Sequence, residues 1–184
     1  MRIRSWKAAV LALALALLVG TGMLATESLD AGAASRSSVE IARGQYLTTI
    51  MDCAGCHTPG ALAGKPDFER RLAGSAIGFA LPGGGVVYPK NITPDTETGL
   101  GHWTEEDIAR AVRQGQSRDG RVLIPVMPWP SYAVLTESDA RAIGAYLKSV
   151  PPVRFEVPRD VRPGEKVQAP YLDVVTPSAA GERP

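Results

Sequence analysis

Apolar residues recur at helical spacing in three stretches of the chain. In the first, Ile41, Tyr46, Leu47 and Ile50 lie along a stretch that is predicted to be helical. Ser37 and Glu40 have the spacing of a capping box, in which each side chain satisfies a free backbone amide at the helix start. The pattern predicts a helix that begins near Ser37 and runs to the cysteine pair that follows it.

A second amphipathic stretch begins after Thr104. Asp107, three residues on, again completes a capping box. Gly115 is a fitting end, because glycine adopts the left-handed conformation that commonly follows the last turn. A helix is therefore predicted between Thr104 and Gly115.

The third stretch begins at Thr136, with Asp139 at the box position, and ends before Pro151. Gly44, inside the first predicted helix, is unfavourable for a helix interior. A glycine in such a place often lets two helices approach closely. We therefore expect the third helix to pack on Gly44.

The rest of the chain is rich in glycine and proline. Residues 58–103 form a long stretch of this kind, and such loops are uncommon in a compact domain unless they wrap around something. Residues 154–184 are proline-rich, which excludes a regular helix or a central strand and predicts an extended wrap or a linker of low order. Residues 35–153 are predicted to form one domain.

The N-terminal segment has the features of an export signal. Basic residues precede an apolar run over residues 8–25, and an A-x-A-like site follows at residues 31–33. Residues 1–34 are therefore predicted to be a signal peptide. The run is also near the lower length limit of a membrane span, so an uncleaved N-terminal anchor remains an alternative. Both interpretations place the body of the protein outside the cytoplasm.

Charge excludes one class of partner. The chain has 20 Lys and Arg and 19 Asp and Glu residues. Three of these basic residues and two of the acidic ones precede residue 35, so the remainder is formally neutral. Nucleic-acid binding favours a clustered basic face, so no nucleic-acid partner is expected.

The most informative motif is C-x-x-C-H, formed by Cys53, Cys56 and His57. It is the attachment signature of a c-type haem: each thiol forms a thioether to a vinyl group, and the histidine becomes an axial ligand of the iron. The motif occurs once, which predicts one covalent haem c. Covalent haem on an exported chain indicates a bacterial periplasm.

Three other uses of the motif fit the sequence less well than haem does. A thioredoxin-like redox pair needs a strand before it, whereas the preceding residues are predicted to be helical. A zinc site would need Cys53, Cys56, His57 and the distant His102, and Cys56 and His57 are adjacent. A disulfide would close a strained four-residue ring.

The second axial position is assigned to Met127. Met1 and Met23 lie in the leader, and Met51 is too close to Cys53 to reach the opposite face of a haem. Met127 is flanked by prolines, which stiffen the segment that presents its thioether. His102 is the competing ligand, although it lies in a polar turn.

Several segments together resemble the class I cytochromes c. More narrowly, the chain is similar to the cytochrome subunits of periplasmic or membrane-bound dehydrogenases of alcohols, sugar acids, aldehydes and N-heterocycles. The segments that carry the resemblance run in the family's order: 43–47, 52–58, 91–95 (Asn-Ile-Thr-Pro-Asp), 98–104, 119–120, 125–132 (Pro-Val-Met-Pro-Trp-Pro-Ser-Tyr) and 145–147.

The resemblance implies an all-α cytochrome c fold with about three main helices and long Gly/Pro-rich loops around one covalent haem. It implies attachment through Cys53 and Cys56, with His57 and Met127 as axial ligands. Many relatives carry three such domains, whereas this chain carries one. Further candidates for contact with the haem or its propionates lie near the motifs: Tyr88, Asn91, Trp103, Arg121, Trp129 and Tyr132.

The expected function is electron transfer rather than catalysis. The protein would carry single electrons from a dehydrogenase to a downstream cytochrome or an oxidase, and would meet a membrane only through an uncleaved anchor. The alternative is a haem enzyme or gas sensor with an open axial position. A subunit that tethers a catalytic partner to the membrane is a third interpretation, compatible with the first.

Overall fold

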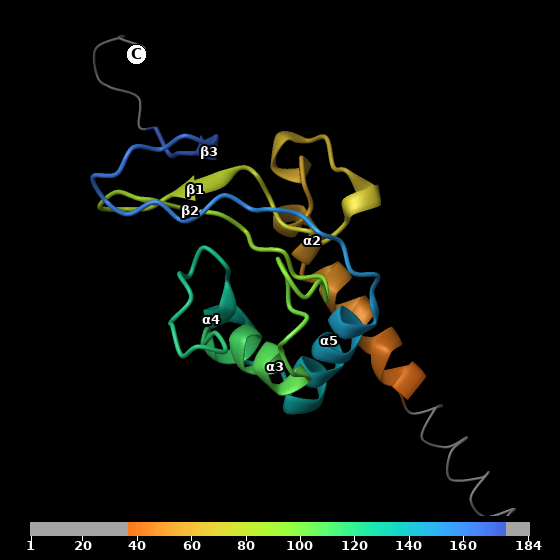
Figure 1. Cartoon of the computed structure of the whole chain (residues 1–184). Helices are drawn as coiled ribbons and strands as arrows, with labels where there is room; N and C mark the ends of the chain where they lie inside the picture. The colour runs from red at the N-terminus through yellow and green to blue at the C-terminus, as the bar shows by residue number, and fades with distance from the viewer. Residues whose placement is uncertain (1–36, 176–184) are drawn as a thin grey trace, which may run out of the picture. The chain divides into compact units, whose positions relative to one another are not determined.

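The computed structural model describes residues 37–175 (Figure 1). The predicted leader, residues 1–34, and the last part of the predicted tail, residues 176–184, lie outside the described residues. The chain divides into two compact units, Met1–Glu40 and Ile41–Pro184. The elements that carry the predicted chemistry all belong to the second unit.

The structure is helical where the apolar periodicity predicts helices. Residues 37–50 are helical from the first described residue onward. Helix α3 spans Glu105–Gln114, and its N-cap Thr104 forms the predicted capping box with Asp107. Gly115 ends α3 in the left-handed conformation, with φ 63°.

Helix α5 spans Glu137–Ser149 and begins at the predicted cap, Thr136, whose side chain accepts from the Asp139 amide. The second half of the predicted capping box is wrong. The Asp139 carboxylate accepts instead from the guanidinium Nε of Arg43 at 2.8 Å. A charged donor from another helix offers a stronger hydrogen bond than the backbone amide of the cap.

Gly44 lies against α5, as predicted for a glycine inside the first helix. A Cβ atom at Gly44 would lie 1.8 Å from the carbonyl oxygen of Ala142 and 2.7 Å from Cβ of Tyr146. The two helices can therefore cross only with glycine at this position. They enclose, with α3, a buried apolar cluster whose members are Leu47, Leu72, Ile108, Val112, Ile143 and Leu147.

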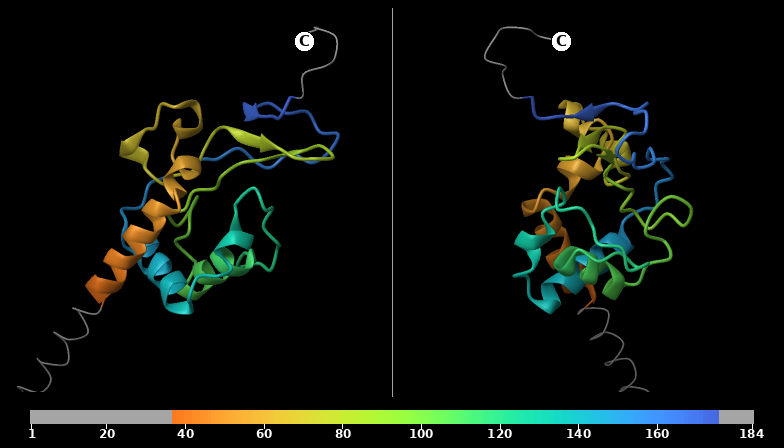
Figure 2. Two further views of the ribbon diagram at one scale, coloured as in Figure 1. Left: turned by 180° about the vertical axis from the view of Figure 1, so that it is seen from behind. Right: turned by 90° about the vertical axis from the view of Figure 1, so that its left-hand side faces the viewer.

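A small sheet accompanies the helices, which the all-α prediction did not anticipate. Strand β1 (Gly78–Ala80) is central, with β2 (Val86–Val87) antiparallel on one side and β3 (Tyr171–Leu172) parallel on the other. Figures 1 and 2 show the C-terminal segment running beside β1 and β2. Val161 of this segment also bridges to Val86. Strands of two or three residues carry too little periodicity to be predicted from sequence.

The long Gly/Pro-rich stretch contains short turns of helix and a tight hairpin. Two 3-10 turns occupy Ala61–Ala63 and Phe68–Arg70. The loop between β1 and β2 has Gly83, Gly84 and Gly85 at φ 85°, 97° and 90°, a region that disfavours other residues. Glycine is thus required at the tip of this hairpin.

Two further short helices frame the predicted chemistry. Helix α2 spans Cys53–His57, and α4 spans Trp129–Tyr132. Within residues 37–175, no helix has both the length and the apolar character needed to cross a bilayer.

Candidate cofactor site

The C-x-x-C-H motif forms a helical turn of its own, set off from the preceding helix by Asp52. The backbone of Asp52 is left-handed, with φ 52° and ψ 41°, a conformation that aspartate tolerates better than bulky residues. Its carbonyl accepts the amide of Gly55 at 3.0 Å. The chain therefore bends at Asp52, and the motif residues of α2 follow in one compact turn.

Both cysteines are free thiols and lie partly buried. Burial raises the pKa of Cys53 to about 11 and also raises that of Cys56. Each sulfur is thus held in its uncharged form, which suits a site where it becomes an uncharged thioether. Among residues 37–175, no group of three or more His, Cys, Asp or Glu side chains is arranged so that it could hold a metal ion.

His57 is oriented by a backbone carbonyl. Its Nδ1 lies 2.7 Å from the carbonyl oxygen of Lys90, and because a carbonyl only accepts, Nδ1 carries the proton. Burial lowers the pKa of His57, an effect that the bond to Lys90 partly opposes. The ring is thus neutral, with a fixed plane and with Nε2 unprotonated, which is the form of histidine that ligates a metal.

Met127 lies in the segment between α3 and α4, residues 115–128, here called the methionine strap. Its side chain is partly buried and packs against the apolar core cluster. Its amide donates to the carbonyl of Ile124 at 3.2 Å, and its carbonyl accepts from the amide of Trp129 at 2.7 Å. The methionine is therefore held by its own turn on both sides.

Trp129 fastens the strap to the end of α3. Its indole Nε1 donates to the carbonyl of Leu123 at 3.0 Å. The ring lies so close to Gly115 that a Cβ there would be 2.3 Å from the indole Cε2. Leu123 in turn donates its amide to the Gly115 carbonyl at 2.6 Å. One aromatic side chain thus links the strap to the C-terminus of α3.

The predicted attachment and ligand residues fit a covalent haem. Cys53 and Met127 pack against the same apolar cluster, which includes Val112 of α3. A neutral imidazole with an unprotonated Nε2 and a thioether on a braced segment are donors that a haem iron accepts, and the two thiols are the groups that form thioether bonds to the haem vinyl groups. The chain thus supplies each group in the required chemical form.

Two of the further haem-contact candidates use their polar groups elsewhere. The hydroxyl of Tyr88 donates to the carbonyl of Ala169 in the C-terminal segment at 3.3 Å. Asn91 is 1% exposed, and its amide nitrogen donates to Thr98 and to the Val153 carbonyl at 2.8 and 2.7 Å. Both residues therefore hold the loops and the C-terminal segment together, and neither has a donor to offer a propionate.

The remaining candidates divide between surface and core. Arg121 is exposed and pairs with Asp119 at 2.8 Å. Tyr132 packs against the core cluster and donates to the Met51 carbonyl at 3.3 Å. Trp103 also packs against this cluster, whereas His102 is exposed, which disfavours it as an axial ligand.

Sequence reasoning missed one residue of this region. Arg113 in the last turn of α3 has a buried Nε with no hydrogen-bond partner among the described residues. From sequence alone, a basic residue in a last turn is explained by the helix dipole, so nothing singled it out. The burial of this one side-chain atom leaves no local signal in the sequence.

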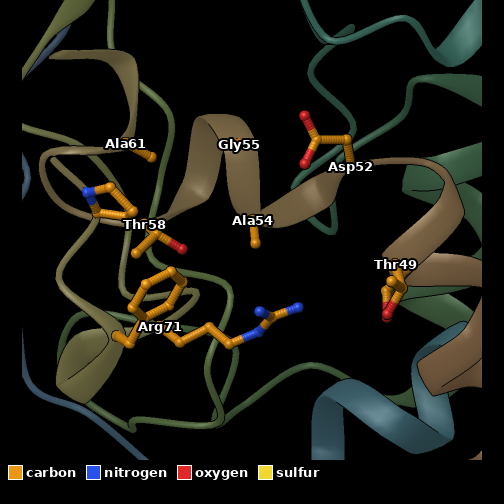
Figure 3. Close-up of a pocket in the computed structure, with 10 residues that line it drawn as sticks. Thr49, Asp52, Ala54, Gly55, Thr58, Ala61 and Arg71 are labelled. Atoms are coloured by element: carbon orange, nitrogen blue, oxygen red, sulfur yellow. The ribbon is translucent and has the colours of Figure 1, made fainter. Parts of the chain in front are cut away.

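A separate hollow of about 340 Å³ lies on another face of α2 (Figure 3). Asp52, Ala54 and Gly55 contribute to its wall, and the side chain of Arg71 extends across it in the view of Figure 3. None of the four predicted attachment and ligand residues lines it. The hollow is therefore distinct from the candidate cofactor site.

Comparison with known proteins places these features in a family context. The family model described as cytochrome c matches residues 41–151. The chain is 41% identical over 127 residues to a nicotinate dehydrogenase subunit of Pseudomonas putida, and this match covers 69% of the chain. It is 38% identical to the gluconate 2-dehydrogenase cytochrome c subunit of Pantoea cypripedii, and 36% identical to the cytochrome c subunit of the quinone alcohol dehydrogenase of Gluconobacter oxydans; each match covers 76% of the chain.

The chain spans only a part of each of these relatives. The matches cover 10% of the nicotinate dehydrogenase subunit, 28% of the alcohol dehydrogenase subunit and 29% of the gluconate dehydrogenase subunit. The region that matches the family model includes C-x-x-C-H, the methionine strap and α5.

Proposed function

The chain belongs to the cytochrome c family, and we propose that it is a periplasmic mono-haem cytochrome that carries single electrons from a dehydrogenase to a downstream cytochrome or oxidase. One observation carries the proposal most directly. Cys53 and Met127, 74 positions apart in the sequence, pack against one apolar cluster, while His57 directly follows Cys56 in α2 with its Nε2 free. This juxtaposition suits one cofactor bound between α2 and the methionine strap.

In this proposal Cys53 and Cys56 hold one haem c by thioether bonds, and His57 and Met127 are its axial ligands. The single C-x-x-C-H motif supports one haem. When bound, the haem supplies the one-electron chemistry, since its iron alternates between the ferrous and ferric states. The tasks of the chain itself are to fix the ligands and to keep the surroundings apolar.

Two hydrogen-bonded arrangements perform the first task. The Lys90 carbonyl accepts a hydrogen bond from the proton-bearing Nδ1 of His57. This bond keeps Nε2 in one orientation and makes Nε2 more basic, and therefore a better ligand for iron. Trp129 and the turn around Met127 hold the thioether in place. A ligand set that is preorganised in this way changes little between oxidation states, which favours rapid electron transfer.

The partners follow from the relatives as a proposal. The relatives named above include cytochrome c subunits of alcohol and gluconate dehydrogenases. We therefore assign the donor to a dehydrogenase of this kind and the acceptor to another cytochrome or an oxidase. The formally neutral chain after residue 34 favours docking through local patches rather than a strongly charged face. The location in the periplasm rests on the export signal, either as a cleaved leader or as a retained anchor.

The test is an optical spectrum of protein matured in a periplasm that contains haem-attachment machinery. Spectra of the oxidised, the reduced and the reduced, carbon-monoxide-treated protein distinguish the possibilities. A covalent low-spin haem, with the weak methionine-to-iron band when oxidised and no change on adding carbon monoxide, supports the electron carrier. A high-spin spectrum that shifts with carbon monoxide contradicts it and favours the haem enzyme or gas sensor with an open axial position.

A further inference from the structure

Arg113 carries a buried polar atom that has no partner among the described residues. Its Nε is inaccessible to solvent and makes no hydrogen bond within residues 37–175, and its guanidinium forms no ion pair with any carboxylate there. Most arginines of the described chain behave differently. Those paired with a carboxylate are Arg43, Arg70, Arg110, Arg118, Arg121, Arg141, Arg154 and Arg159.

A buried guanidinium donor without an acceptor is unfavourable. Arginine stays charged at any physiological pH and has five N–H donors, and nearly all buried polar atoms of native proteins find a partner. Arg110, the other basic residue of this helix, is paired, so the unpartnered Nε of Arg113 points to an acceptor outside the described residues.

The position of Arg113 indicates which acceptor this is. Its neighbour on one side, Val112, belongs to the apolar cluster against which Cys53 and Met127 pack. Two residues on, Gly115 is covered by the ring of Trp129, which follows the methionine strap. Along the chain, Arg113 thus stands between Val112, a residue of the apolar cluster, and the methionine strap, which begins at residue 115.

A haem brings two carboxylates into such a site. A planar guanidinium pairs with a carboxylate through two parallel hydrogen bonds, and it can do so where water is excluded. Three of the candidates named from the sequence use donors elsewhere: Tyr88 and Asn91 bind the C-terminal segment, and Arg121 pairs with Asp119. We infer that Arg113 binds a haem propionate through its guanidinium. This inference rests on the proposed function.

The experiment compares three variants of the full-length, periplasmically matured protein. Arg113→Gln removes the positive charge. Arg113→Lys keeps the charge but loses the planar guanidinium that can form two parallel hydrogen bonds. Arg121→Gln makes the same charge change at a surface arginine. The readouts are the midpoint potential and the propionate bending band in the resonance Raman spectrum. Retention of the methionine-to-iron band shows in each variant that the axial ligands are intact.

We expect Arg113→Gln to lower the midpoint potential more than Arg121→Gln does, because loss of a nearby positive charge favours ferric iron. The propionate band should shift in both Arg113 variants and stay in place in Arg121→Gln. Arg113→Lys should keep most of the potential. If Arg113→Gln does not accumulate, the band shift of Arg113→Lys alone still tests the inference.

An unshifted propionate band in the Arg113 variants would overturn the inference, as would equal falls in potential for Arg113→Gln and Arg121→Gln. A shift confined to Arg121→Gln would move the propionate contact to Arg121. The wild-type protein distinguishes a failure of the proposed function from a failure of this inference. If it holds no covalent low-spin haem, the proposed function fails; if it does and the Arg113 variants match it, only this inference fails.

Discussion

His57 depends on a partner that no single side-chain replacement can remove. The acceptor for its Nδ1 is the backbone carbonyl of Lys90, so any residue at position 90 could supply it provided the segment keeps its course. The orientation of the ring is therefore a property of the chain path. Met127 differs, because its thioether is a side-chain group and its contribution can be tested by one substitution.

Met127→Ala is expected to abolish the methionine-to-iron band and to open the iron to carbon monoxide. Thioether ligation raises the potential, so the variant should have a lower midpoint potential, by an amount on the order of 0.1–0.3 V within the roughly 0.8 V range that axial ligands span. Redox titration with optical detection measures this. Met51→Ala is the matched control, since Met51 also packs against the core cluster. An unchanged band and potential in Met127→Ala would refute the ligand assignment.

At the scale of elements, the sequence predicted the start of a helix correctly where a residue type has a specific role there. Thr104 and Thr136 cap α3 and α5 as predicted, because a threonine oxygen at a helix start satisfies an otherwise free amide. The predicted role of Asp139 was wrong, because its partner Arg43 is 96 residues away. The unpartnered Nε of Arg113 was missed because the burial of one side-chain atom leaves no local pattern in the sequence.

Gly44→Ala tests the crossing of the first helix and α5. The added methyl would overlap the Ala142 carbonyl, which is backbone and cannot turn aside, so the helices must separate. We expect a loss of about 2–4 kcal/mol in the free energy of unfolding, because such overpacking outweighs the better helix propensity of alanine. Denaturant unfolding measures it. Gln45→Ala, on the exposed next position, should change stability little, and an equal effect in both variants would contradict the close approach.

Trp129→Phe tests whether the hydrogen bond of Trp129 to Leu123 holds the methionine strap in place. Phenylalanine keeps an aromatic ring beside Gly115 but cannot donate to the Leu123 carbonyl, so the strap is expected to loosen without unfolding. Loss of one hydrogen bond of about 1 kcal/mol should let added imidazole displace Met127 at roughly fivefold lower concentration. The fading of the methionine-to-iron band during an imidazole titration measures this.

The control for the strap is Tyr88→Phe. It also removes one aromatic donor from a backbone carbonyl, that of Ala169, but it does so at the sheet. The imidazole titration of this variant should match that of the wild type. If both variants release Met127 equally, the effect belongs to general destabilisation and the role of Trp129 in holding the strap is wrong.

At the scale of the whole molecule, the C-terminal segment acts on the site from a distance. Asp160 accepts from the Tyr88 amide at 3.1 Å and from the Lys90 ammonium at 2.6 Å. Lys90 is the residue whose carbonyl orients His57. Sequence predicted an extended wrap or a linker of low order here, and it could not choose between them, because each contact joins residues about 70 positions apart. Such pairings leave no local pattern.

Asp160→Ala is therefore expected to loosen the segment that holds His57. The ion pair with Lys90 is about half exposed and contributes little, but the Tyr88 amide would lose its acceptor beside a buried side chain. Together these predict a loss of about 1–2 kcal/mol in the free energy of unfolding. Hydrogen exchange should accelerate at the Tyr88 amide and less at Val86, whose amide is bonded to the Val161 carbonyl at 2.9 Å.

The control for Asp160→Ala is Asp173→Ala, which removes an exposed carboxylate from the same segment. Within residues 37–175, this carboxylate accepts only from the Val174 amide. This variant should leave exchange at Tyr88 unchanged. Equal protection of Tyr88 in Asp160→Ala and in the wild type would mean that β2 and Lys90 keep their course without the C-terminal segment. The orientation of His57 would then depend on the cytochrome c domain alone, and the segment after residue 153 would have no part in shaping the site.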